Sequence, residues 1–446
     1  NDRYIERDIM AKVISHWTLS NLPVVIIAPV LSLILGLDVK TTYVLFITLL
    51  IGTPTMSLIG SIAAALTLSL KKNNSRHIGV WTASAFVISS MIGTGVFTSL
   101  GYQLVDINTA FPILLLWLIG GVISLFGAFS YSELASAFPR SGGEYSILSK
   151  VYHPAVGFIG GFVSSTIGFS APAVLAAIAL GKYTVAIFPQ LNSTIIASVI
   201  ILLFNLIHSQ TLKYGRLIQD WTTIGKIVLI IFFIISGLLI DSPQNISFLP
   251  IPNDGSLIMS SSFAVSLVWV SYAYTGWNST VYIAGEVKNP QKNIHYSLLF
   301  STAFVTVLYI LLNFIFLFST PISEMRGMIE VGFIAGVNIF GDQGGRIVSG
   351  GIALLLLSTI SSYVFIGPRI TQVIGEDFKY LRFFSKVNNS GIPINGFIFQ
   401  LSISLIFILT STFEQVLLYA GITFIIINTI TVIGVIVLRF YQPTLN

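Results

Sequence analysis

A single stretch decides the fold of this chain: Ser90-Met91-Ile92-Gly93-Thr94-Gly95-Val96-Phe97. It lies inside an apolar segment, and its glycines weaken a helix enough to let the backbone unwind at mid-membrane depth. Inside a bilayer, each freed N–H or C=O group costs several kcal/mol unless something polar satisfies it. A bound zwitterion could do so, because its carboxylate accepts from the amides and its ammonium donates to the carbonyls. The stretch therefore fits a site for a small amino acid or amine. The alternative is a glycine-rich contact between closely packed membrane helices.

The composition of the chain is that of a polytopic membrane protein. Of its 446 residues, 54% are hydrophobic and only 9% are charged, with a mean hydropathy of +0.89, whereas soluble proteins carry about 25% charged residues. The net charge of +5 is spread over short loops, which indicates topology rather than a nucleic-acid partner. The chain has no cysteine and its five histidines show no ligand spacing, so we expect no metal and no cofactor. Clustered His, Asp or Glu inside the spans are also missing, so we expect no enzyme.

Twelve apolar segments are long enough to approach the about 20 residues that a membrane helix needs. Two precede a short basic linker at 73–77, and ten follow it. They are expected at 17–36, 42–69, 78–100, 110–131, 152–180, 193–209, 218–240, 258–284, 296–319, 344–367, 393–412 and 415–438. With the start of the chain inside, 17 of the 22 Lys and Arg residues are cytoplasmic and four are external, which predicts this orientation. The longest loop, 320–343, has room for a short helix.

The ten spans after the linker divide into two groups of five. The first span of one group contains Gly93-Thr94-Gly95, and the first span of the other contains Tyr274-Thr275-Gly276-Trp277. Interrupted helices at matching positions in two halves are typical of inverted-repeat transporters. The pairing favours the substrate site over the packing contact. It predicts a break in the helix at both places and predicts that the two breaks face each other.

Lys226 falls inside a span. A lysine there costs about 2.5–3.5 kcal/mol on insertion scales, so it rarely persists without a role. It could carry a proton or act as a fixed cation in place of a sodium ion. The alternative is a lysine near a helix end that extends to the cytoplasmic surface. An inward-facing ammonium should contact freed carbonyls of the 78–100 span and hydroxyls of the 344–367 span. The candidate hydroxyls belong to Thr359, Ser361 and Ser362.

Two further groups of side chains have more than one interpretation. Tyr272, Tyr274 and Trp277 flank the second interruption, where they could close over a substrate, although such residues are also common in membrane belts. Glu133, Arg140 and Glu144 lie in the cytoplasmic loop after the second of the ten spans. They could lock the inward face or only cap and turn the chain.

Four ordered motifs make the chain resemble the amino acid–polyamine–organocation (APC) superfamily permeases, near the L-type amino acid transporter branch. The motifs are Met91–Phe97, Pro139-Arg140-Ser141-Gly142-Gly143-Glu144-Tyr145, Ala273–Asn278 with Glu286-Val287-Lys288-Asn289-Pro290, and Gly367-Pro368-Arg369 with Gly375-Glu376-Asp377. The resemblance covers residues 78–446. It implies an all-α integral membrane protein with a LeuT-type 5+5 inverted-repeat core. Such permeases usually have twelve spans, so the resemblance also implies a core that lacks the family's last two helices.

The resemblance implies roles for individual residues. Amides around Thr94 and Gly95 would bind the substrate carboxylate. Carbonyls near Ile92, Tyr272 and Thr275 would bind its ammonium, and the Tyr272 ring would be the gate. Lys226 falls where many members keep a lysine in place of a second sodium. The expected substrate-binding residues are Ile92, Gly93, Thr94, Gly95, Tyr272, Ala273, Thr275 and Gly276, and the expected coupling residues are Lys226, Thr359, Ser361 and Ser362.

Residues 1–72 resemble a different family, the membrane subunit of the haem exporter of cytochrome c maturation (CcmB-like). The similar stretches are Ala11–Trp17, Leu35–Val39 and Gly52–Thr55. We interpret this part as a two-helix fragment, which adds two transmembrane helices in front of the core. The linker 73–77 would join it to the permease core, 78–446.

The sequence as a whole predicts a secondary active transporter of amino acids that works by alternating access. It would be proton-coupled or an exchanger, and it would lie in the cell inner (cytoplasmic) membrane as a multi-pass protein. Its expected partners are a small amino acid or amine, protons in the coupled case, and the lipid bilayer. The alternative function is that of a membrane component of haem export and cytochrome c maturation, which rests on the N-terminal resemblance.

Overall fold

The computed structural model describes residues 76, 78–138, 143–210, 213–388 and 391–441, with the backbone alone at 213–223. The two spans expected before residue 72, most of the linker 73–77 and the loop 139–142 lie outside these residues. Within them the chain consists of helices and loops, and its one β-bridge joins the single residues Ile78 and Val287. The expected all-helical fold is therefore confirmed for the described part of the chain.

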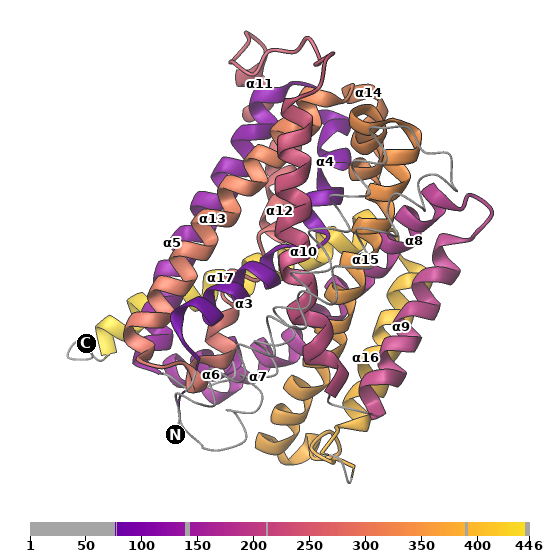
Figure 1. The fold of residues 1–446 in the computed structure, drawn as a ribbon. Coiled ribbons are helices and arrows are strands. Elements are labelled where there is room, and N and C mark those ends of the chain that lie inside the picture. The colour runs from indigo at the N-terminus through magenta and orange to yellow at the C-terminus, as the bar shows by residue number, and fades with distance from the viewer. Residues whose placement is uncertain (1–75, 77, 139–142, 211–212, 389–390, 442–446) are drawn as a thin grey trace, which may run out of the picture.

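The helices follow the chain in one continuous series (Figure 1). They are α3 (Val80–Met91), α4 (Gly95–Asp106), α5 (Ala110–Ala137), α6 (Gly143–Val151), α7 (Pro154–Val163), η1 (Ser164–Gly168), α8 (Phe169–Ile187), α9 (Ser193–Gln210), α10 (Lys213–Leu238), α11 (Asp254–Ile258), α12 (Ser261–Ala273), η2 (Ser279–Glu286), α13 (Pro290–Ser319), α14 (Ile322–Met325), α15 (Val331–Asp377), η3 (Lys379–Leu381), α16 (Ile394–Thr410) and α17 (Phe413–Tyr441). In the described residues, seven helical segments are long and apolar enough to cross a membrane, and three shorter apolar helices accompany them. Together they fall on the ten segments expected between residues 78 and 446.

The 258–284 span is α-helical as far as Ala273 and resumes as the 3-10 segment η2, with the interruption where a break is expected. One expected boundary is wrong. The expected loop 320–343 is largely helical, since it contains α14 and the first part of α15. Gly341 kinks α15 with a φ of 80°, a left-handed conformation that glycine adopts without strain. This kink separates the first part of α15 from the part that covers the expected 344–367 span.

The first and the sixth of the ten segments are both interrupted in the middle. Ile92 leaves the helical conformation with a ψ of 88°, so α3 ends at Met91 and α4 begins at Gly95. In the sixth segment, α12 ends at Ala273, and Gly276 has a φ of 101° that no right-handed helix contains. Both predicted helix breaks are confirmed.

The two broken segments lie in the interior of the helix bundle. α4 contacts α12, while α3 packs against α10 and α13. Long pairs of helices enclose them, with α5 beside α13 and α8 beside α15 (Figure 1). Large buried aromatic side chains fill this interior, among them Trp117, Tyr274 and Tyr309. The breaks are thus surrounded by protein, which is the setting in which irregular backbone is tolerated at membrane depth.

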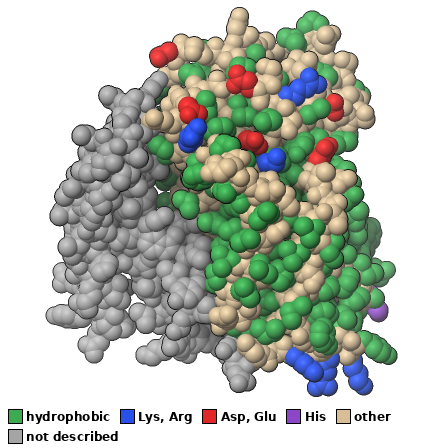
Figure 2. Space-filling model, turned by 90° about the vertical axis from the view of Figure 1, so that its right-hand side faces the viewer, with side chains coloured by type: hydrophobic (Ala, Val, Ile, Leu, Met, Phe, Trp, Pro, Cys, Tyr) green, Lys and Arg blue, Asp and Glu red, His purple; other side chains and the backbone are tan. Residues whose placement is uncertain are grey.

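The outer surface has the distribution of side chains that a bilayer requires. Figure 2 shows one face on which hydrophobic side chains cover the middle, with mixed charges toward the top and Lys and Arg at the lower edge. Several of the exposed side chains are large and apolar, including Phe126, Leu239 and Ile436. This band fits contact with lipid, and the basic edge fits a cytoplasmic side.

Candidate functional site

The two helix breaks lie directly against each other. A Cβ added at Gly95 would lie 2.5 Å from the Cβ of Ala273, and one added at Gly276 would lie 2.6 Å from the carbonyl oxygen of Ser90. Carbon atoms in contact are about 3.5–4.0 Å apart, so only glycine permits these approaches. The prediction that the two breaks face each other is confirmed.

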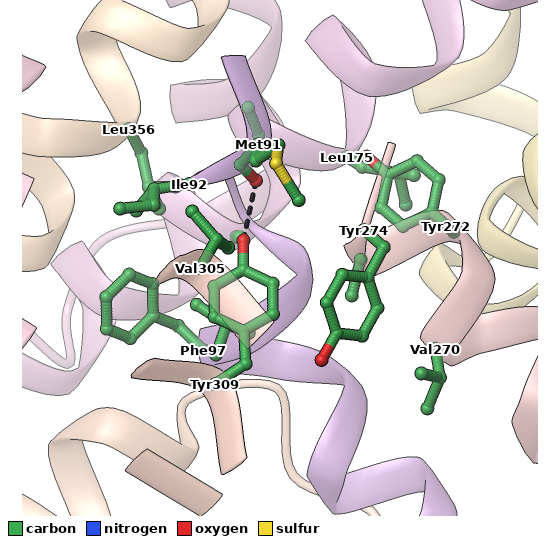
Figure 3. Packing of buried hydrophobic residues seen from close by; sticks show 14 of the residues in the cluster. Met91, Ile92, Phe97, Leu175, Val270, Tyr272, Tyr274, Val305, Tyr309 and Leu356 are labelled. Atoms are coloured by element: carbon green, nitrogen blue, oxygen red, sulfur yellow. Dashed lines mark hydrogen bonds between the residues drawn. The ribbon is translucent and has the colours of Figure 1, made fainter. Parts of the chain in front are cut away.

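Hydroxyl groups from two neighbouring helices bridge the first break. The Tyr309 hydroxyl donates to the carbonyl oxygen of Met91 at 2.6 Å, which satisfies a carbonyl at the end of α3 (Figure 3). The Tyr272 hydroxyl lies 3.3 Å from Thr94 Oγ1. At the start of α4 the Phe97 amide donates to the Thr94 carbonyl at 3.0 Å, whereas the amides before it have no acceptor within the helix and face the break. A helix N-terminus of this kind favours a negatively charged group.

The carbonyl groups of the second break are partly occupied. The carbonyl oxygen of Tyr272 accepts from the Thr275 amide at 2.9 Å and from Thr275 Oγ1 at 2.7 Å. Because a carbonyl oxygen has two lone pairs, the Tyr272 carbonyl is not free for a substrate ammonium in this conformation. The Tyr274 hydroxyl donates to the Trp117 carbonyl at 2.8 Å, so this ring belongs to the packed interior rather than to a gate.

A cavity of about 110 Å³ adjoins the second break. The expected site residues divide between this cavity and the packed interior. Those that line the cavity are Lys226, Thr275, Gly276, Thr359 and Ser362. Those that do not are Ile92, Gly93, Thr94, Gly95, Tyr272, Ala273 and Ser361. Six aromatic side chains form much of the remaining wall: Phe86, Phe169, Trp277, Tyr282, Tyr363 and Phe424.

Lys226 is buried in the bundle instead of extending to a surface. Its side chain is only 4% exposed. Its Nζ atom donates to Thr359 Oγ1 at 3.1 Å and to the carbonyl oxygen of Ser89 at 3.5 Å. Ser89 belongs to the last turn of α3, where the helix offers few N–H donors to its carbonyl oxygens. The ammonium thus joins α10 to α3 and α15. The alternative, a lysine side chain that extends to the cytoplasmic surface, is wrong.

Ser361 and Ser362 do not bond to Lys226. Ser361 Oγ lies 2.9 Å from His208 Nε2 on α9, and Ser362 Oγ donates to the Ser358 carbonyl at 2.8 Å. The reason is helical geometry, because residues two apart on a helix point to different sides. Thr359 and Ser361 therefore cannot both face Lys226, and the expectation for Ser361 is wrong.

Glu144 brings a second ionisable group to the cavity wall. It lies at the start of α6 with 4% of its side chain exposed. Its carboxylate accepts from the Tyr282 hydroxyl, from the Asn278 amide and, at 3.4 Å, from the Tyr131 hydroxyl. Burial raises the pKa of the Glu144 carboxyl, while these hydrogen bonds act in the opposite direction. Glu144 therefore connects α6 to α5 and to the segment after the second break.

Several contacts of the site were not foreseen from the sequence. Tyr309 and Tyr282 each stand in a span, and an isolated tyrosine there was the one available signal, because a buried phenol hydroxyl usually has a partner. Glu133, which we considered together with Glu144 as a possible lock of the inward face, lies outside the cavity and pairs with Arg439 at 2.9 Å. In the part of the chain that the structure describes, no three His, Asp or Glu side chains form a group that could hold a metal ion.

The fold and the facing breaks define a multi-pass membrane protein with a cavity beside the second helix break. The family model for amino acid permeases matches residues 78–446, and the chain belongs to this family, whose members are transporters rather than enzymes. A second model, for CcmB proteins, matches residues 4–132. This match extends beyond residue 72 and overlaps the permease match in α3, α4 and most of α5.

Curated relatives cover most of the chain. The chain is 30% identical over 347 residues to the serine/threonine exchanger SteT of Bacillus subtilis (strain 168), which covers 75% of this chain and 77% of that protein. It is 25% identical over 383 residues to the b(0,+)-type amino acid transporter 1 of Oryctolagus cuniculus, with 83% and 77% covered. It is 22% identical over 378 residues to the large neutral amino acids transporter small subunit 2 of Homo sapiens, with 82% and 70% covered.

Proposed function

We propose that this chain is a secondary active transporter of amino acids, with a LeuT-type 5+5 core that gives alternating access to a site between the two helix breaks. The observation that carries the proposal is the pair of breaks that face each other at Gly95 and Gly276. Paired interruptions at matching positions place the substrate at the interface of two inverted repeats. The names of the relatives, which are amino acid transporters and exchangers, support the same substrate class.

The pattern of helix contacts supports the 5+5 repeat. In such a repeat, a contact between two helices should recur between their counterparts in the other half. α3 contacts α13, and α12 contacts α5; α10 contacts α15, and α17 contacts α8. Likewise α8 contacts α9, and α15 contacts α16. Three further contacts, of α5 with α13, α8 with α15 and α9 with α16, join helices to their own counterparts.

Substrate binding would use the backbone on both sides of the gap. The free amides at the start of α4, around Thr94 and Gly95, would receive the carboxylate. Carbonyls at the ends of α3 and α12, near Ile92 and Ala273, would receive the ammonium, and the Tyr272 ring would close over the site. Backbone groups suit this role, because every amino acid presents the same carboxylate and ammonium.

The inner halves of the two broken segments would move together. The amide of Ile78 donates to the Glu286 carbonyl at 3.0 Å, and the amide of Lys288 donates to the Ile78 carbonyl at 2.9 Å. These bonds tie the start of α3 to the chain just after η2. Lys226 holds the other end of α3 to α15, so a change in its charge would release or restrain this unit. Lys226 is therefore our candidate coupling residue, either as a proton carrier or as a fixed cation in an exchanger.

The proposal is tested by uptake and counterflow of labelled amino acids in proteoliposomes, with and without a pH gradient. Accumulation driven by an inward proton gradient would indicate symport, whereas uptake only into vesicles preloaded with amino acid would indicate exchange. Failure of every amino acid to enter, with protein that is folded and inserted, would contradict the proposal. We place the protein in the cell inner membrane with its N-terminal end inside, on the strength of the charge distribution.

A second candidate function rests on the CcmB match at residues 4–132. Residues 1–72 could take part in haem export, with the linker 73–77 joining them to the permease core. This candidate covers a smaller part of the chain than the permease match, and we rank it second.

Deleting residues 1–72, with a start codon supplied, should leave amino acid uptake in place. The reason is that both helix breaks, the cavity and Lys226 lie within 78–446. An even number of removed spans also preserves the orientation of the rest. The measurement is initial uptake per inserted protein, compared with the full chain. Complete loss of uptake by a well-expressed deletion would show that the first 72 residues belong to the working unit.

A further inference from the structure

A polar groove lies between α5 and α13, at the end of these helices that the charge distribution places in the cytoplasm. Its volume is about 390 Å³, within the range of about 300–1,000 Å³ that is usual for ligand pockets. Among the described residues, it shares no lining residue with the cavity beside the second break. The polar side chains that line it are Ser130, Ser132, Glu133 and Ser136 of α5 and Gln291 and His295 of α13.

Glu133 and Arg439 bring opposite charges to this groove. Arg439 lies near the end of α17, which reaches the lower ends of α5 and α13 (Figure 1). Its Nε and Nη2 atoms donate to the Glu133 carboxylate at 2.9–3.1 Å. A carboxylate has about four acceptor positions and a guanidinium has five N–H donors, so these three bonds leave capacity on both partners. Both side chains also remain accessible, with 71% of Arg439 and 43% of Glu133 exposed.

His295 adds a second acceptor to the groove. The Ser132 hydroxyl donates its one proton to the Phe129 carbonyl at 2.7 Å. Its contact with His295 Nδ1 at 3.0 Å must therefore be donated by the imidazole. In the neutral ring this leaves Nε2 as an acceptor, and Nε2 has no hydrogen-bond partner in the described part of the chain. A ligand with several N–H donors on one positive nitrogen suits this acceptor together with the Glu133 carboxylate.

An apolar surface continues from the groove along both helices toward the middle of the membrane. Its exposed side chains are Val122, Phe126 and Phe129 on α5 and Tyr296, Phe300 and Val307 on α13. Those of α5 are four and three residues apart, and Glu133 follows Phe129 by four, so all of them share one face of the helix. A molecule with its polar end in the groove would thus have an apolar surface for its tail. This arrangement suits a lipid better than a soluble molecule.

The charges of the groove match a head group that contains a primary ammonium close to a phosphate. The ammonium has three N–H donors, which Glu133 and His295 Nε2 would accept. The phosphate would accept from the guanidinium of Arg439, a charge-assisted contact of the strong kind. A choline head group offers no N–H donor to these acceptors, and a glycerol head group has no positive charge for Glu133.

We infer that the groove between α5 and α13 binds the head group of phosphatidylethanolamine from the cytoplasmic leaflet, with Glu133 and His295 on the ammonium and Arg439 on the phosphate. Because α5 packs against both α13 and α17, the bound lipid would join three helices at their cytoplasmic ends and stabilise their packing. The inference concerns a site outside the transport pathway, and it does not depend on which substrate the protein carries.

The test measures the melting temperature of the purified full chain in detergent as lipid is added. The probes are dioleoyl-phosphatidylethanolamine, its mono- and dimethylated forms, phosphatidylcholine and phosphatidylglycerol with the same acyl chains. A ligand that binds the folded state raises the melting temperature in a saturable way. We expect this rise with phosphatidylethanolamine, a smaller rise with each added methyl group, and little change with phosphatidylcholine.

Two substitutions locate the effect in the groove. Glu133→Gln and His295→Phe should each raise the half-saturating concentration of phosphatidylethanolamine about tenfold, as for loss of a hydrogen bond to a charged group. Glu376→Gln is the matched control, because Glu376 is an exposed carboxylate near the cytoplasmic end of α15 and lies outside the groove. We expect the control to respond to lipid like the parent.

Four results would overturn the inference. Equal stabilisation by phosphatidylethanolamine and phosphatidylcholine would show that the groove only holds water. Stronger stabilisation by phosphatidylglycerol would assign the effect to basic residues instead of Glu133. An unchanged preference for phosphatidylethanolamine in both folded variants would place the lipid elsewhere. Full stabilisation by soluble glycerophosphoethanolamine, added in phosphatidylcholine, would make the ligand a soluble molecule. The series of methylated lipids uses the parent protein, so it decides the question even where a variant does not fold.

Discussion

Gly95→Leu should abolish amino acid binding while the protein still inserts into the membrane. Gly95 opens α4, and its Cα is packed so tightly on α12 that even a Cβ would meet the Cα and Cβ of Ala273. Overpacking of an interior costs about 1–3 kcal/mol where side chains can move aside. Here the obstacle includes backbone, so α4 and α12 must separate and the gap between the two breaks must change shape. The measurement is binding of the best substrate to purified protein in detergent.

Gly255→Leu is the matched control for this substitution. Gly255 lies in the short helix α11, and a Cβ there meets no atom within 4 Å. We expect the control to bind substrate like the parent. Normal substrate affinity in the Gly95→Leu protein would contradict the assignment of the site to the facing breaks.

Lys226→Met should remove uptake that is driven by a pH gradient, even if some exchange survives. Methionine keeps much of the length of lysine but has neither charge nor donor, so the contacts to Thr359 Oγ1 and to the Ser89 carbonyl are lost. If Lys226 carries the coupled proton, its loss removes the change of charge that would release or restrain α3 when the proton gradient is applied. The measurement is accumulation of the best substrate in proteoliposomes under an inward proton gradient, compared with counterflow in the same preparation.

Lys379→Met provides the control, because Lys379 is exposed in η3 and lies outside the cavity. Both preparations should contain the same amount of inserted protein. Accumulation by Lys226→Met that equals that of the parent would show that this lysine is not the coupling residue. Its burial against α3 and α15 would then serve the fold alone.

Much of the fold could be predicted because it depends on local composition. Apolar segments of membrane length locate the ten spans between residues 78 and 446. The glycines of the two interruptions locate the helix breaks, since the backbone departs from the helix close to where they stand. The kink at Gly341 was missed, because Gly344 and Gly345 follow shortly after it and residue type does not show which of these glycines takes a positive φ.

The candidate site was predictable in part. The inward direction of Lys226 and its contact with Thr359 follow from the cost of an unpaired charge at membrane depth. The predicted contact of Ser361 with Lys226 was wrong, because neighbouring helices set the rotation of a helix about its axis. Here Ser361 faces α9 and contacts His208. The partners of Glu144 come from α5 and from the segment around η2, which lie far apart in the sequence.

Residue type and spacing thus determine that this chain crosses the membrane, where its helices break and which side chains are too polar to be left without partners. Packing alone decides which partners they find. Tyr309 reaches the Met91 carbonyl, and Lys226 reaches Ser89, because α13 and α10 both lie against α3. A hydrogen bond needs atoms within about 3 Å, and only the three-dimensional arrangement of the helices brings such distant residues that close.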